Sequence, residues 1–228
     1  PGARGETTMS EPEVIGRVAS VNVGRPRTVE WYGRRVRTSI WKEPVDGPVA
    51  VQGVNLDGDE QSDLRVHGGY DKAIYAYAVE DYRWWSSELG VELEPGTFGE
   101  NLTTEGVELA DAVIGERWLV GSATLEISEP RLPCYKLGMR MGDSTFVDDF
   151  DQASRFGAYL RIADEGEVAA GSEIVRVHRP ESTLTIGDLV EAHHRPTPGL
   201  LGRIAATSAV PEPWRAMAER ALLRRQAR

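Results

Sequence analysis

The chain has 228 residues, of which 40% are hydrophobic and 27% charged, and its formal net charge is −10. This composition argues against a disordered protein, and the negative charge argues against a general nucleic-acid binder, which needs many contacts to phosphates. No run approaches the ~20 apolar residues of a membrane helix, and residues 1–8 lack the apolar core of a signal peptide. Because Cys134 is the only cysteine, no internal disulfide can form, and we expect a cytoplasmic protein.

Most of the chain between residues 14 and 178 has the pattern of short β-strands. The first half predicts strands over 14–23, 29–40 (two strands around a tight turn at Tyr32-Gly33), 49–54 and 73–77, and then a helix over 80–89. The second half predicts strands over 118–120, 124–128, 159–162 and 173–178, with a loop at 165–171. Many short strands with few helices predict a mainly β domain over 14–178, a closed or nearly closed β-barrel, because closure removes unpaired strand edges.

The pattern changes after residue 180, and residues 181–228 predict a small three-helix module. Thr185 and Asp188 form a capping-box pattern that opens a helix over 186–193. A second helix follows around Leu200, and Pro211 opens a third with apolar residues at helical spacing. Since about 48 residues make a poor core alone, we expect the module to dock on the barrel. Arginines outnumber acidic residues over 201–228, which marks either a partner site or a solvated helix face.

Two familiar kinds of metal site do not match. Residues 57–63 are acidic like an EF-hand loop, but their glycine is in the wrong position, so we interpret them as a solvated acidic turn. His193 and His194 are adjacent, so on a helix we expect their side chains to diverge rather than bind one metal.

Three other segments are candidates for chemistry. In the first, Gly68-Gly69 permits close approach of a ligand, and Arg65, His67 and Lys72 offer donors for an anion; the alternative is a plain glycine turn with outward charges. In the second, residues 95–102, Asn101 offers both a donor and an acceptor, and the alternative is a structured loop.

The third segment, residues 129–136, contains the lone cysteine. Arg131 and Lys136 flank Cys134 and would favour the thiolate, which acts as a nucleophile or a metal ligand. The alternative is that Cys134 is a small buried apolar residue.

Together these segments resemble the MOSC domain, named after the C-terminal domain of molybdenum cofactor sulfurase, and within it the YiiM-like branch. The resemblance rests on the order and spacing of residues 57–63, His67-Gly68-Gly69, Asp71-Lys72-Ala73, 98–102, Pro130-Arg131, Pro133-Cys134, 157–159 and 166–171. It covers the chain from about residue 14 to its end, where the helices resemble the "3-alpha" module of this branch. One departure is Arg65-Val66-His67, where some relatives have two histidines in a row.

The resemblance implies a strand-rich barrel that binds the molybdenum cofactor, with Cys134 as the molybdenum ligand. It places His67 and Arg65 near the metal and the substrate, His67 as proton donor, and Lys72, Asn101, Arg131 and Lys136 around the pterin and its phosphate. The implied reaction is the two-electron reduction of N-hydroxylated compounds such as hydroxylamino purines and amidoximes. The chain has no flavin or iron–sulfur motif, so the electrons come from a separate reductase, docking at the basic C-terminal helices; family habit also implies a homodimer.

Two other function classes remain open. Cys134 would carry a persulfide or deliver the cofactor in a carrier protein, without turnover of N-hydroxylated compounds. In a non-catalytic binding barrel, Cys134 would only pack in the core.

Overall fold

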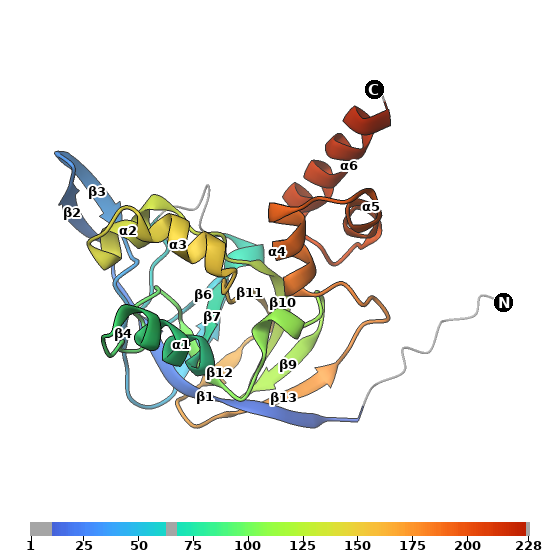
Figure 1. The fold of residues 1–228 in the computed structure, drawn as a ribbon. Helices are drawn as coiled ribbons and strands as arrows, with labels where there is room; N and C mark the ends of the chain where they lie inside the picture. The colour runs from blue at the N-terminus through green and yellow to red at the C-terminus, as the bar shows by residue number, and fades with distance from the viewer. Residues whose placement is uncertain (1–10, 63–67, 227–228) are drawn as a thin grey trace.

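Seven strands hydrogen-bond to one another in a closed ring in the computed structural model, which describes residues 11–62 and 68–226 (Figure 1). Around the ring they are β1 (Glu13–Val23), β13 (Glu173–His178), β9 (Arg117–Val120), β10 (Ala123–Pro130), β11 (Ala158–Asp164), β7 (Ile74–Ala78) and β8 (Leu102–Glu105). The pairing of β1 with β13 closes the barrel, and β7 with β8 is its parallel pair. The expected mainly β fold with a closed barrel is therefore confirmed.

The barrel strands follow from alternating burial along the sequence. In β10, Ala123, Leu125 and Ile127 are buried, whereas Thr124 and Glu126 between them are partly exposed. This two-residue period puts one row of side chains inside the barrel. The adjoining β9 is joined to β10 by a turn at residues 121–122.

Short strands extend the barrel on one side. β2 (Arg27–Trp31) and β3 (Arg34–Thr38) form a projecting hairpin whose turn residues Tyr32 and Gly33 both have positive φ, 47° and 71° (Figure 1). β4 (Glu43–Pro44) pairs with the end of β1, and a small sheet contains β12 (Gly166–Val168), β5 (Val49–Gln52) and β6 (Asn55–Leu56). The expected loop at 165–171 thus contains a strand, because β5 supplies a partner far away in sequence.

Helices α1 (Val79–Leu89), α2 (Tyr135–Met141) and α3 (Phe146–Ala153) lie on one side of the barrel (Figure 1). The sequence pattern predicts α1, but it does not predict α3. Two aromatic residues, Phe146 and Phe150, bury one side of α3 against Trp85 of α1. Short 3-10 turns, η1 (Tyr70–Lys72) and η2 (Leu109–Asp111), complete this part of the chain.

Helices α4 (Ile186–His194), α5 (Pro198–Ala206) and α6 (Glu212–Gln226) follow the last barrel strand. The Thr185–Asp188 capping box is present with both of its hydrogen bonds. α4 lies against β10 and η2, whereas α5 packs on α6. That residues 181–228 form a module separate from a 14–178 domain stays a prediction. Within the described ranges, no helix combines the length and the apolar character needed to cross a membrane.

Candidate functional site

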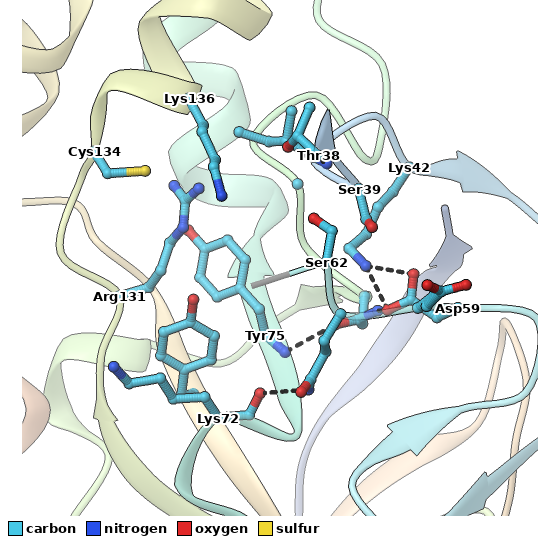
Figure 2. Close-up of a pocket in the computed structure, with 16 residues that line it drawn as sticks. Thr38, Ser39, Lys42, Asp59, Ser62, Lys72, Tyr75, Arg131, Cys134 and Lys136 are labelled. Carbon is cyan, nitrogen blue, oxygen red and sulfur yellow. Dashed lines mark hydrogen bonds and ion pairs between the residues drawn. The ribbon is translucent and has the colours of Figure 1, made fainter. Parts of the chain in front are cut away.

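A pocket at the base of the β2–β3 hairpin gathers most of the residues that the sequence singles out (Figure 2). The empty space between its walls, counted out to the open mouth and including open solvent there, is about 590 Å³. All five candidate residues that the structure describes line it: Lys72, Asn101, Arg131, Cys134 and Lys136. Arg65 and His67 lie outside the described residues, so their predicted places near the metal and the substrate stay predictions.

Cys134 lies between the end of β10 and the start of α2 and is partly exposed, not buried. Its sulfur lies on the same side of the pocket as the side chains of Arg131 and Lys136 (Figure 2). The thiol therefore has access to the pocket and two cationic neighbours, as the sequence predicts. A cysteine packed away in the core, the third interpretation, does not fit this position.

Arg131 is the buried cation of the pocket. Its guanidinium stacks over the ring of Tyr75 at 5.0 Å, and its Nη1 atom is buried without a hydrogen-bond partner among the described residues. Burial opposes its charge, but Tyr75, Tyr159 and Cys134 raise the pKa of Arg131 above its ordinary value. A charged guanidinium held in a pocket with an unused N–H is prepared to bind an anion.

Lys136 and Lys72 enter the pocket from different elements. Lys136 is buried in the first turn of α2, while Lys72 ends the 3-10 turn η1. The Nζ atom of Lys72 lies 3.8 Å from Glu129 and 5.9 Å from the ring centre of Tyr159. Glu129 also accepts a 2.7 Å hydrogen bond from the indole N–H of Trp214 in α6, so the C-terminal helices contact the ion-pair partner of the pocket residue Lys72.

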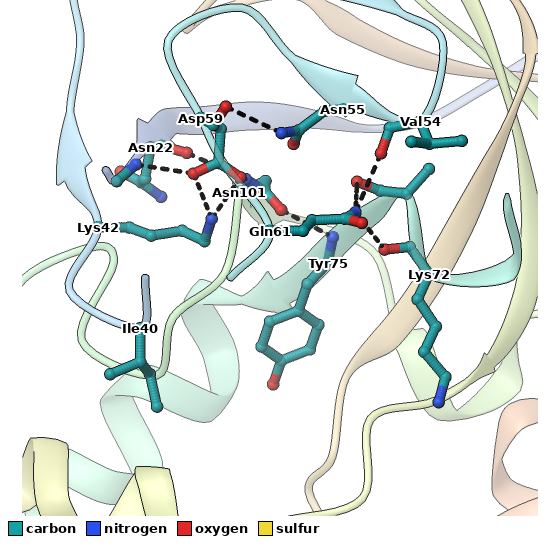
Figure 3. Close-up of polar contacts among 12 residues, drawn as sticks. Asn22, Ile40, Lys42, Val54, Asn55, Asp59, Gln61, Lys72, Tyr75 and Asn101 are labelled. Carbon is teal, nitrogen blue, oxygen red and sulfur yellow. Dashed lines mark hydrogen bonds and ion pairs between the residues drawn. The ribbon is translucent and has the colours of Figure 1, made fainter. Parts of the chain in front are cut away.

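A buried ion pair, which the sequence pattern did not reveal, forms the opposite wall (Figure 3). Lys42 Nζ lies 2.6 Å and 2.5 Å from the two carboxylate oxygens of Asp59, and the side chains are only 9% and 2% exposed. The interpretation of residues 57–63 as a solvated turn is therefore wrong for Asp59. Its side chain turns inward, where it also accepts a hydrogen bond from the backbone N–H of Gly24 at 2.8 Å.

Asn101 connects this ion pair to the barrel. Its Oδ1 atom accepts from the backbone N–H of Tyr75 at 3.1 Å, and its Nδ2 atom donates to Asp59 at 2.9 Å. Both ends of the amide are thus used within the protein, which gives Asn101 a positioning role. The contact to a cofactor expected of Asn101 stays a prediction.

Two glycines bring the 96–99 turn close enough to hold Lys42 in place. Gly96 has φ 85°, and a Cβ atom there would lie 2.4 Å from the carbonyl oxygen of Lys42. Gly99 has φ 81°, and a Cβ atom would lie 2.9 Å from the side chain of Ile40. Because a side chain is excluded at both positions, this turn can press against residues 40–42.

Gln61 fixes the glycine turn that carries Lys72 (Figure 3). Its amide nitrogen donates to the carbonyl oxygens of Val54 at 3.0 Å and Lys72 at 3.1 Å, and its oxygen accepts from the N–H of Gly69 at 3.0 Å. Gly69 has φ 91°, a backbone conformation that favours glycine. The acidic segment and the glycine turn are therefore one unit of structure.

The structure adds Lys42, Asp59, Gln61, Tyr75 and Tyr159 to the pocket. The rarity of lysine was a signal that could have found Lys42. The chain has only three lysines, and the structure shows that all three line this pocket. Chemically, the pocket offers one thiol and several cations, and its carboxylate Asp59 is neutralised by the ion pair with Lys42. That combination suits a ligand with an anionic group at one end and a thiol-binding atom at the other.

Comparisons with known proteins agree with this picture. The family model of the MOSC domain matches residues 63–175. The chain is similar to the uncharacterized protein YflK of Bacillus subtilis, with 34% identity over 87% of this chain and 91% of that protein. It is also similar to YiiM of Escherichia coli, with 30% identity over 74% of this chain and 76% of that protein.

The chain is also similar to part of a longer protein and to a solved structure. A protein of Gibberella moniliformis named "Reductase" is 31% identical over 65% of this chain but only 27% of its own length. The crystal structure of YiiM from Geobacillus stearothermophilus superposes with a TM-score of 0.76 and 32% identity, over 91% of this chain and 99% of that one.

Proposed function

The chain belongs to the MOSC domain family, and from this premise we propose that it binds the molybdenum cofactor and reduces N-hydroxylated compounds by two electrons. The family is associated with this cofactor, and relatives named YiiM and "Reductase" point to an oxidoreductase. The observation that carries the proposal is the buried guanidinium of Arg131, with Nη1 lacking a partner among the described residues, in the same pocket as Cys134.

The pocket residues fit the chemical parts of the cofactor, a pterin that carries a dithiolene and a phosphate. A thiolate is a soft ligand that suits molybdenum, and Cys134 is the only thiol in the chain. Arg131, Lys136 and Lys72 would hold the anionic groups, because guanidinium and ammonium groups form charge-assisted hydrogen bonds to phosphate. Lys42 is less available, since Asp59 neutralises it.

The bound cofactor would supply the two electrons that break the N–O bond. The overall reaction takes two electrons and two protons, and it converts R–NH–OH to R–NH₂ and water. The protein's own tasks are to bind the substrate beside Cys134 and to deliver protons. His67 is the proposed donor because imidazole exchanges protons near neutral pH.

The electrons come, in this proposal, from a separate reductase that docks on the basic C-terminal segment. α6 contains Arg215, Arg220, Arg224 and Arg225, and Trp214 at its start contacts Glu129, the ion-pair partner of the pocket residue Lys72. Replacing Arg220 and Arg224 by glutamate should raise the KM for a protein donor. Turnover with a small chemical reductant should stay unchanged. Equal loss with both donors would contradict docking at α6.

The direct test is to purify the protein from cells able to make the cofactor and to measure molybdenum and released pterin. We expect one molybdenum per chain, and Cys134→Ser should lose both the metal and the reduction of a hydroxylamino base. Tyr135→Phe is the matched control, since Tyr135 is the exposed next residue and does not line the pocket. Protein that holds no molybdenum and fails to bind added cofactor would refute the proposal. A persulfide on Cys134, seen by mass spectrometry without activity, would favour the sulfur-carrier alternative.

A further inference from the structure

Three potential metal ligands converge far from Cys134 in sequence, where α3 meets the end of α4. The Nε2 atom of His193 lies 3.1 Å from Asp151 Oδ1, and the Nδ1 atom of His194 lies 3.7 Å from Asp151 Oδ2. One ligand atom from each of these residues lies within 4.8 Å of the other two. The expectation that adjacent histidines diverge is thus wrong here, because each imidazole has a nitrogen close to a carboxylate oxygen of Asp151 on the neighbouring helix.

Packing holds both imidazoles in this arrangement. The buried ring of Phe156 lies 6.3 Å from the ring of His193 and 6.0 Å from that of His194, and the two imidazoles are 4.9 Å apart. The Nε2 atom of His194 lies 3.3 Å from Ser154 Oγ, which leaves Nδ1 facing Asp151. A hydrogen bond on the second ring nitrogen is the usual outer-shell support of a metal-bound histidine.

The three donor groups and the charges around them indicate which kind of metal ion would bind. Two imidazoles and one carboxylate favour a borderline transition metal over Mg²⁺ or Ca²⁺, which prefer oxygen ligands. The ion pairs of Asp151 within the described part of the chain run only to His193 and His194, and the nearest cation along the chain, Arg155, is paired with Asp81. The exposed Asp148 and Asp149 on α3 add negative charge.

We propose that Asp151, His193 and His194 bind one divalent ion of the Zn²⁺, Co²⁺ or Ni²⁺ class. The three side chains remain about one-quarter to one-third exposed, so water can complete the coordination. Because Asp151 belongs to α3 and the histidines to α4, the ion cross-links the helices beside the barrel to the C-terminal helices. This site is independent of the pocket around Cys134 and of the function proposed for it.

The test titrates the full chain with Zn²⁺ by calorimetry, with Mg²⁺ as the negative control. It is repeated in Cys134→Ser, because the thiol is another zinc ligand that the chain offers. Co²⁺ serves as a spectroscopic probe, since its visible absorption reports the ligand set. The variants are Asp151→Asn and His194→Asn, and the matched controls are Asp149→Asn on the same helix and His178→Asn on β13.

We expect one equivalent of Zn²⁺ to bind in the Cys134→Ser background and to raise the Tm by about 5 °C at saturating metal. Asp151→Asn and His194→Asn should each weaken binding at least tenfold, whereas both controls should bind as the parent does. Melting curves without metal show whether each variant is folded. Zinc affinity and cobalt spectra unchanged in Asp151→Asn, or no zinc-dependent heat in the folded parent, would overturn the proposal.

Discussion

Lys42 and Asp59 form an ion pair in which both oxygens of the carboxylate lie within 2.6 Å of the ammonium and almost no part of either side chain reaches solvent. Burial lowers the pKa of Lys42, and the attraction of Asp59 opposes that shift. The fold therefore depends on Asp59 to keep a charged lysine in its interior.

Replacing Asp59 by asparagine should destabilise the protein strongly. It leaves the buried ammonium of Lys42 without its counter-charge, a loss that typically costs about 3–5 kcal/mol. Chemical denaturation measures the change in the free energy of unfolding. Asp57→Asn is the matched control, because Asp57 is exposed in the same loop and should change stability little. Equal effects of the two substitutions would show that the pair contributes nothing.

The reactivity of Cys134 should reveal the cations around it. The protein has no other thiol, so alkylation reports this one position. Arg131 and Lys136 line the same pocket and should attract an anionic reagent. The rate of alkylation by anionic iodoacetate, divided by the rate with neutral iodoacetamide, should therefore be higher for Cys134 than for glutathione. The excess should fall with added salt and in Arg131→Met. A ratio equal to that of glutathione at low salt would contradict a cationic pocket.

Small anions should stabilise the protein through Arg131. The Nη1 atom is buried without a partner in the described structure, so an anion that accepts its hydrogen bond binds the folded state preferentially. Inorganic pyrophosphate should raise the Tm of the parent protein by a few degrees, but not that of Arg131→Met. Arg195→Met, which removes an exposed arginine at the end of α4, serves as the control and should respond like the parent.

Glu100 should make stability fall between acid and neutral pH. Burial raises the pKa of Glu100 above its ordinary value of 4.5, and the Oε2 atom has no hydrogen-bond partner among the described residues. A raised carboxyl pKa gives stability that is fully present below pH 4.5 and is lost as the pH rises through the folded-state pKa. The Tm, measured at a series of pH values from 4 upward, should therefore fall less steeply with pH for Glu100→Gln than for the parent. The exposed Glu88→Gln should leave the slope unchanged; a parent-like slope in Glu100→Gln would contradict this assignment.

The contact between Trp214 and Glu129 should couple the C-terminal helix to the barrel. Trp214→Phe removes the indole donor from a buried carboxylate, which typically costs about 1–3 kcal/mol. In a Glu129→Leu background the same substitution should cost much less, because no carboxylate is left unsatisfied. Denaturation of the four proteins of this cycle gives the coupling energy, and additive effects would show that the hydrogen bond is not stabilising.

Local patterns in the sequence predicted the local parts of the structure. The Tyr32-Gly33 turn, the Thr185 capping box and the strand alternation of β10 each depend on residues within one element, so they can be read without the fold. Five of the seven candidate site residues are described by the structure, and all five line one pocket. Their roles came from the family resemblance and not from a local pattern, and the places of Arg65 and His67 stay predictions.

The missed features all depend on partners that are distant in sequence. Helix α3 has only Phe146 and Phe150 as buried anchors, and its partner Trp85 belongs to α1. The inward turn of Asp59 makes sense only once Lys42 and Asn101 lie beside it. No local period in the sequence signals a contact of this kind.

The barrel closes through its first and last strands, β1 and β13, and this has a consequence for synthesis on the ribosome. When β1 emerges, the chain that will cover its outer edge has not yet been translated. Pairing with β8 protects one edge midway, but the other stays open until residue 178 has left the exit tunnel. Such late, long-range pairing is slow and exposes strand edges, so the nascent chain is the stage at which this protein is most prone to aggregate.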